Sequence, residues 1–133
     1  MSGREKGFRM TSPSLVVTVR ELSALPEQIE KSVRPHVGNG VVLEVGTSSA
    51  DMNTYRDIVR TWRTPIRLLL ITIPDGAAAD HAYDDWVHWI AGGGLLAIQD
   101  NQPLHERAVA SGKFRELPTS EGLRILQRIA ACN

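Results

Sequence analysis

Apolar residues along this 133-residue chain fall into short runs, broken by at most two polar residues, separated by longer stretches with a helical period. Residues 41–45 and 66–73 are runs of this kind, and each predicts a strand buried on both faces of a sheet. Residues 95–98 predict a third such strand. Residues 15–19 are β-branched and apolar, which fits either a short edge strand or the lead into a first helix.

The stretches between the runs predict helices. Residues 26–37 carry Ile29, Val33 and Val37 on one face, with Pro26 in the first turn and Gly38 as the stop. The same period predicts helices over residues 51–62 and 79–91 and a short helix over 105–111. Residues 74–76 read as a turn, and the three glycines at 92–94 are expected to end the helix before them. Trp62, Trp86 and Trp89 are expected to pack these helices on the sheet.

The C-terminal pattern differs from the rest. Residues 114–117 and 123–129 predict two strands joined by a turn, which should form an antiparallel hairpin at one edge. Strands that alternate with helices before this point predict an α/β fold with a parallel sheet covered on both faces. The length fits one domain, residues 15–133, preceded by a flexible polar tail over residues 1–14.

Composition excludes some partners. Fifteen basic residues balance fifteen acidic ones, so no overall charge recruits nucleic acid or an anionic membrane surface. No apolar run approaches the roughly 18 residues of a membrane span, so no membrane partner is expected. The single cysteine, Cys132, has no internal disulfide partner, which predicts a cytoplasmic location.

Small residues after the first buried run form the candidate binding motif. An acid, Glu44, is followed by Gly46, Thr47, Ser48 and Ser49, and then by a predicted helix. A turn at the carboxyl end of such a strand, together with the amides that begin the next helix, places donors against a cofactor. These five residues are therefore the predicted cofactor-binding residues.

Four segments in order resemble one enzyme family. They are Glu44-Val45-Gly46-Thr47-Ser48-Ser49-Ala50, then Pro74-Asp75-Gly76, then Trp86-Val87-His88-Trp89-Ile90-Ala91-Gly92-Gly93-Gly94-Leu95-Leu96-Ala97, and finally Gly122-Leu123-Arg124-Ile125-Leu126. Over residues 25–130 the chain resembles class I S-adenosylmethionine-dependent methyltransferases, whose parallel sheet ends with a reversed last strand. The resemblance implies a Rossmann-like three-layer sandwich with a reduced, mostly parallel sheet and a C-terminal antiparallel hairpin.

The resemblance also implies a metal site. In methyltransferases of the catechol and caffeoyl-CoA type, an Asp-Asn pair and an earlier acid bind a divalent cation, and Asp75, Asp100 and Asn101 match them in order and approximate spacing. Their oxygen ligands suit Mg²⁺, which would activate the hydroxyl group of a small-molecule acceptor, with Asp75 beside that acceptor as the catalytic residue. Asp and Asn after a strand are also common turn formers, so the alternative of a purely structural role stays open.

Two departures separate the chain from that family. Only residues 63–65 lie between the predicted helix at 51–62 and the next strand, where relatives place two further strands and a helix that supply the ribose-binding acid. Ala50 replaces the last glycine of the first motif. The missing strands should leave an exposed sheet edge, which predicts a homo-oligomer paired through it.

Three functions follow from these patterns. The first is an S-adenosylmethionine-dependent methyltransferase acting on a small-molecule oxygen. The second is a non-catalytic methyltransferase-like binding or assembly module that has lost the central cofactor-binding segment. The third is a different α/β domain, of flavodoxin-like or amidotransferase-like type.

Overall fold

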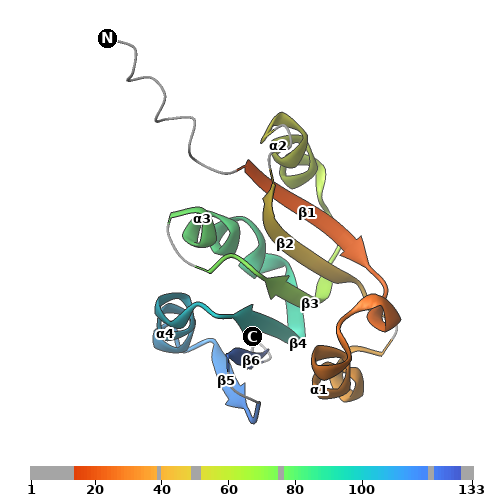
Figure 1. Ribbon diagram of the computed structural model, residues 1–133, viewed down its shortest axis with the longest axis vertical. Coiled ribbons are helices and arrows are strands. Elements are labelled where there is room, and N and C mark those ends of the chain that lie inside the picture. The colour runs from red at the N-terminus through yellow and green to blue at the C-terminus, as the bar shows by residue number, and fades with distance from the viewer. Residues whose placement is uncertain (1–13, 39, 49–51, 75–76, 120–121, 130–133) are drawn as a thin grey trace.

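Six strands form one open sheet, in the order β1-β2-β3-β4-β6-β5 (Figure 1). The computed structural model describes residues 14–38, 40–48, 52–74, 77–119 and 122–129. The strands are β1 (Ser14–Arg20), β2 (Val42–Ser48), β3 (Ile66–Ile71), β4 (Ile90–Gln99), β5 (Phe114–Leu117) and β6 (Leu123–Arg128). The helices are α1 (Glu27–Val37), α2 (Met52–Thr61), α3 (Ala77–Trp86) and α4 (Gln102–Ala110), with short 3₁₀ turns η2 (Leu22–Ala24) and η3 (Val87–Trp89).

The sheet is mixed in direction. β2, β3 and β4 are parallel neighbours joined by α2 and α3. β1 pairs antiparallel with β2, and β6 lies between β4 and β5 and is antiparallel to both. Two of the five pairings are therefore parallel, and the expectation of a mostly parallel sheet was wrong. The reason lies at the N-terminus, where the ambiguous apolar segment forms an edge strand that begins at Ser14, the last residue of the predicted tail.

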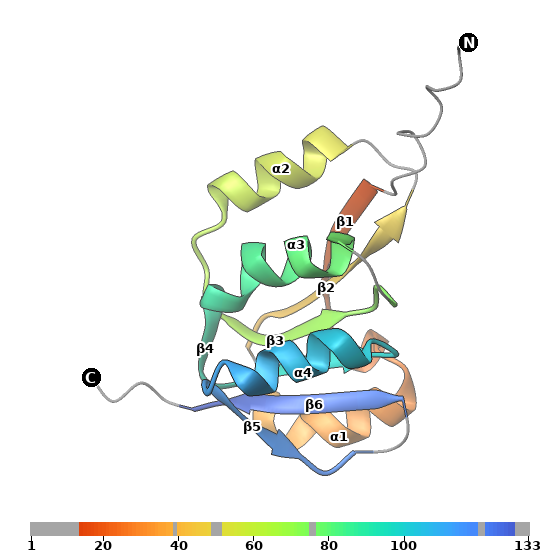
Figure 2. The ribbon, with the colours of Figure 1, turned by 90° about the vertical axis from the view of Figure 1, so that its left-hand side faces the viewer.

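Helices cover both faces of the sheet. Figure 2 shows α2, α3 and α4 along one face and α1 on the other. Trp86 and Tyr55 belong to the core that lies under α2, α3 and α4. Ile29, Val33 and Val37, the face predicted for the first helix, pack with residues of β3, β4 and β6 in the second core. Because α1 contacts β3 and β4, it leaves β1 and the end of β2 uncovered on its side.

The three glycines at 92–94 lie inside β4 instead of ending a helix, so that prediction was wrong. Residue Ile66 of β3 pairs with Ile90, and Leu68 pairs with Leu95, so four residues of β4 bulge opposite Arg67. Pairing with β3 before and after this bulge, and with β6 directly after it, keeps the segment in the sheet.

Arg67 ties three elements together at this end of the sheet. Its Nη1 donates to the carbonyl oxygen of Gly92 at 3.2 Å, and its Nη2 donates to that of His36, near the end of α1, at 2.9 Å. A cation at a helix C-terminus stabilises carbonyl groups that lack an intrahelical partner.

Candidate functional site

The strand that carries the candidate motif is longer than the sequence predicted. Gly46, Thr47 and Ser48 were expected in a turn, but all three continue β2 as far as its pairing with Ser14. The turn prediction for these residues was wrong, because β1 provides a partner that extends the strand. Successive amides of an extended chain point to opposite sides, so they do not converge on one cofactor group as amides of a turn do. Ser49 and Ala50 lie outside the described residues.

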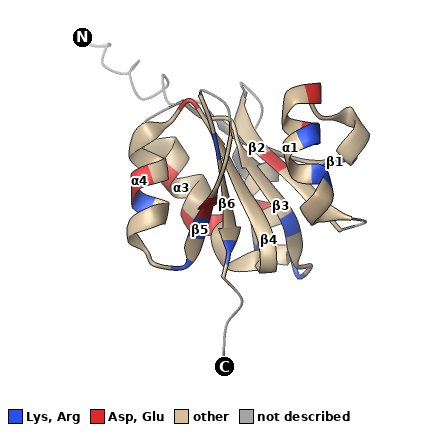
Figure 3. Ribbon diagram, turned by 90° about the horizontal axis from the view of Figure 1, so that it is seen from below, with Lys and Arg blue, Asp and Glu red and all other residues tan. Residues whose placement is uncertain are grey.

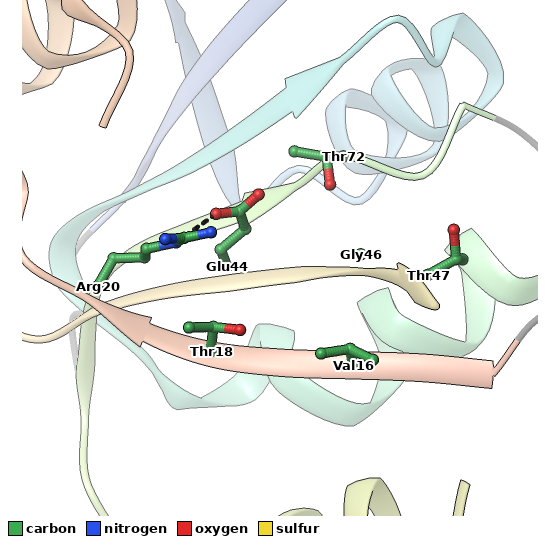
Figure 4. Close-up of a pocket in the computed structure, with 7 residues that line it drawn as sticks. All are labelled: Val16, Thr18, Arg20, Glu44, Gly46, Thr47 and Thr72. Atoms are coloured by element: carbon green, nitrogen blue, oxygen red, sulfur yellow. Dashed lines mark hydrogen bonds and ion pairs between the residues drawn. The ribbon is translucent and has the colours of Figure 1, made fainter. Parts of the chain in front are cut away.

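A polar pocket of about 290 Å³ opens on the uncovered part of the α1 face (Figure 4). It is lined by Val16, Thr18, Arg20, Glu44, Gly46, Thr47 and Thr72. The register explains this set, because Val16 pairs with Gly46 and Thr18 pairs with Glu44, which puts these residues on the same face. Three of the five predicted cofactor residues therefore line one pocket, together with residues that the prediction did not include.

An ion pair forms part of the lining of this pocket. Nε of Arg20 donates to Oε1 of Glu44 at 2.7 Å, and Figure 4 shows the two side chains side by side. Their side chains are 42% and 24% exposed, so a solvated pair of this kind adds little to stability, about 0–1 kcal/mol. The pair instead presents one positive and one negative group to whatever enters the pocket.

Gly46 allows β3 to come close to β2 at the far end of the pocket. A Cβ atom at Gly46 would lie 3.0 Å from Oγ1 of Thr72, tighter than ordinary contact. Thr72 follows β3 directly, and its amide donates to the carbonyl oxygen of Val45 at 3.1 Å. Because Gly46 has no side chain, β2 and β3 can lie close together here, and space is left beside the hydroxyl group of Thr72.

Sequence reasoning missed Thr18, Arg20 and Thr72. One signal was present, because residues 15–20 alternate between apolar and polar positions toward their end, as expected of an edge strand with one solvated face. Thr72 is one of two polar residues in the apolar run at 66–73, the other being Arg67. Neither signal identifies Glu44 as the partner of Arg20, since that contact depends on the antiparallel register of β1 and β2.

The structure places two of the three predicted metal ligands, Asp100 and Asn101. Asn101 is buried and is the N-cap of α4: its Oδ1 accepts from the amide of Leu104 at 3.0 Å, and its Nδ2 donates to the carbonyl oxygen of Ile73 at 3.0 Å. Asp100 is exposed, with φ of 55°, and Asp75 lies outside the described residues. Within the described part of the chain, no three His, Cys, Asp or Glu residues are placed to hold a metal ion. Asn101 therefore fits a structural role better than coordination of Mg²⁺.

Replacing Asn101 with alanine is expected to lower the free energy of unfolding by about 2 kcal/mol or more, because it removes a helix cap and leaves the buried carbonyl of Ile73 without its donor. Asp100→Asn, which removes the charge but suits the left-handed conformation, should change it by less than about 0.5 kcal/mol. Urea denaturation with and without millimolar Mg²⁺ measures both. If Mg²⁺ raises the free energy of unfolding of the wild type and this increase disappears in Asp100→Asn, the result would support the predicted metal site.

A second polar cluster joins α2 to α3. Tyr55 OH donates to Oδ2 of Asp85 at 2.7 Å and accepts from Nε1 of Trp86 at 2.9 Å, and His81 Nε2 lies 3.4 Å from the same carboxylate oxygen. Burial raises the pKa of the Tyr55 phenol, and the hydrogen bond to Asp85 raises it further. The phenol therefore stays protonated near neutral pH and acts as a donor that links the helices, so it does not act as a base.

No protein-family model matches this chain. None of the helices in the described residues is both long enough and apolar enough to cross a bilayer. The basis for assigning a function is therefore the pocket and the fold around it.

Proposed function

We propose that this protein is a methyltransferase-like binding module that takes a small zwitterionic ligand at the Arg20–Glu44 pocket and does not itself transfer a methyl group. The observation that carries the proposal is the ion pair itself, which lies in a pocket on a sheet face that α1 leaves uncovered. This is the second of the functions derived from the sequence, with the ligand class added.

The fold supports the methyltransferase-like part of the proposal. Three parallel strands lie at the centre, helices cover both faces, and the last strand runs in reverse between its neighbours. A reversed last strand is a feature of the family that the four sequence segments resemble. The same features support a Rossmann-like arrangement of this sheet.

Three features favour binding over catalysis. The backbone at residues 46–48 is extended, so it does not form the amide-lined turn that holds the cofactor. Asn101 is engaged as a helix cap, which removes it from a metal site. The chain passes from the end of α2 at Thr61 to the start of β3 at Ile66 without the strands that carry the ribose-binding acid in relatives.

The size and lining of the pocket indicate the ligand. A volume of about 290 Å³ lies at the lower limit of sites for drug-sized molecules, which start at roughly 300 Å³. Val16 is the only residue with an apolar side chain in the lining, which also contains the hydroxyl groups of three threonines. A free amino acid matches this arrangement, with its carboxylate toward Arg20 and its ammonium group toward Glu44.

Binding is tested with L-methionine, S-adenosylmethionine and adenosine, measured by calorimetry and thermal shift. We expect L-methionine and S-adenosylmethionine to bind through their common amino-acid end, adenosine to leave the melting temperature unchanged, and no methylated product to form from a simple phenol. The double variant Arg20→Gln/Glu44→Gln should weaken binding of L-methionine by about tenfold or more, because it removes both charged contacts.

A matched control is available on α2. Arg60 and Asp57 form an exposed ion pair at 2.6 Å, and Arg60→Gln/Asp57→Asn removes the same charges outside the pocket. An equal loss of affinity for L-methionine in both double variants would contradict the proposal. Tight binding of S-adenosylhomocysteine that survives Arg20→Gln/Glu44→Gln would also contradict it and would place the cofactor elsewhere.

An S-adenosylmethionine-dependent methyltransferase for a small-molecule oxygen acceptor is the second candidate. It is favoured by one observation, that Gly46 and Thr47 line a pocket at the carboxyl end of a parallel strand. In that candidate Glu44, Gly46, Thr47, Ser48 and Ser49 hold the cofactor, and formation of methylated product in the assay above would select it.

Self-association through an exposed sheet edge stays a prediction. The strand at the edge beside β2 is β1.

A further inference from the structure

The Arg20–Glu44 pocket continues along the sheet face beyond its ion pair. Glu44 and Gly46 are two residues apart on β2, so both positions belong to the same face. Val16 of β1 pairs with Gly46 on one side, and Thr72, directly after β3, approaches Gly46 on the other. Figure 4 shows Gly46 and Thr72 beyond Glu44 as seen from Arg20. These three residues therefore form a second end of the pocket, past the charged groups.

This second end of the pocket is uncharged. Arg20 and Glu44 are the only charged residues in the lining. Glu44 is also the only charged residue of β2, and the central strands in Figure 3 are tan over most of their length. A charged group placed beside Gly46 would lose water without gaining a counter-ion, so this end favours a neutral part of a ligand.

The hydroxyl group of Thr72 has acceptor capacity that the described residues do not use. Its Oγ1 donates to the carbonyl oxygen of Val45 at 3.4 Å, near the outer limit of a hydrogen bond. Among the described residues, no group donates a hydrogen bond to this Oγ1. A Cβ atom at Gly46 would lie 3.0 Å from it, so the oxygen lies over the glycine. Because a hydroxyl oxygen accepts as well as donates, a ligand group above Gly46 can donate to Oγ1.

We propose that the pocket selects an amino acid with a short, uncharged side chain that carries a hydroxyl group, and that Thr72 determines this selectivity. The inference rests on the amino-acid binding proposed above and adds the class of side chain. Gly46 lies about 7 Å along the strand from Glu44, a distance that the ligand's charged groups and a short side chain span together. The hydroxyl group donates to Oγ1 of Thr72, and the carbon atoms of the side chain contact Val16 across the glycine. L-Threonine, with a hydroxyl and a methyl group on one carbon, offers both contacts.

L-Threonine and L-valine test this selectivity, because they have nearly the same shape and differ by one hydroxyl group. Calorimetry on the full-length chain should give an affinity for L-threonine about fivefold to tenfold higher than for L-valine, as one net hydrogen bond provides. Thr72→Val replaces the hydroxyl group with a methyl group and should remove this preference by weakening L-threonine alone. Its melting temperature should stay close to that of the wild type, because the carbonyl oxygen of Val45 keeps its hydrogen bond from the amide of residue 72.

Thr18→Val is the matched control, because Thr18 lines the same pocket but pairs with Glu44 and not with Gly46. Whatever its effect on affinity, it should leave the ratio of the affinities for L-threonine and L-valine unchanged within about twofold. An equal loss of preference in Thr18→Val and Thr72→Val would overturn the inference.

Two further outcomes separate this inference from the proposed function. If L-threonine and L-valine bind equally to the wild type, and both bind more weakly to Arg20→Gln/Glu44→Gln, the amino-acid site stands and the selectivity is wrong. If neither amino acid gives a heat of binding, the amino-acid site and its selectivity are both wrong.

Discussion

Trp86→Ala is expected to lower the free energy of unfolding by about 3–5 kcal/mol, the cost of removing a large aromatic side chain from a core. Trp86 is fully buried at the end of α3. Its ring makes edge-to-face contacts with Tyr55, at 6.2 Å between centroids, and with Trp62, at 5.5 Å. The indole also donates the hydrogen bond that Tyr55 accepts, so alanine leaves both a cavity and an unpaired oxygen lone pair between α2 and α3.

Urea denaturation followed by circular dichroism measures the loss. Trp89→Ala is the control, because Trp89 is only partly buried against the same core and should cost clearly less. Trp86→Phe should fall between the two, since it keeps much of the ring and loses the indole donor. Equal losses for Trp86→Ala and Trp89→Ala would show that Trp86 is not central to this core.

Gly40→Ala is the second large effect, with an expected cost of about 1–3 kcal/mol from overpacking. A Cβ atom at Gly40 would lie 1.7 Å from Cγ and 2.6 Å from Cβ of Arg67, which are the inner atoms of that side chain. Arg67 has to move to make room. Such a movement breaks its hydrogen bonds to the carbonyl oxygens of Gly92 and His36, so β4 and the end of α1 lose a common donor.

A double-mutant cycle with Arg67→Ala tests this mechanism. If Gly40→Ala acts by displacing Arg67, then Arg67→Ala should cost less in the Gly40→Ala background than in the wild type, with a coupling of at least about 0.5 kcal/mol in unfolding experiments. Simple additivity would mean that Gly40 and Arg67 act independently and would contradict the packing described above.

Much of the fold was predictable from local patterns. The helical spacing of Ile29, Val33 and Val37 identified the buried face of α1, which ends before Gly38 as expected. The apolar run at 66–73 contains β3, which is buried at five of its six positions. These predictions succeeded because the period of apolar residues reflects which side of an element meets the core, and that requirement is local.

The candidate site was predictable only in part. Glu44, Gly46 and Thr47 were chosen for their position after a buried strand, and they do line a pocket. Arg20 was not predicted, because exposure to solvent is enough to explain a charged residue at the end of an edge strand. Asn101 was chosen as a metal ligand, but its two hydrogen bonds make it a helix cap that is tied to the end of β3.

Local patterns thus determined the existence of the helices, the central strands and the apolar core of this chain, since each depends on residues within one or two turns. The helix expected over 79–91 was wrong at its end, because α3 ends at Trp86 and residues 90–91 belong to β4. Pairing between distant segments determined the rest: β1 drew residues 46–48 into a strand, and pairing with β3 before and after the bulge kept 92–94 in β4. Glycine is compatible with turns and with strands, so the hydrogen-bonding partners across the sheet decide between them. The same pairing brings Arg20 beside Glu44, and the proposed binding site exists only once β1 and β2 have met.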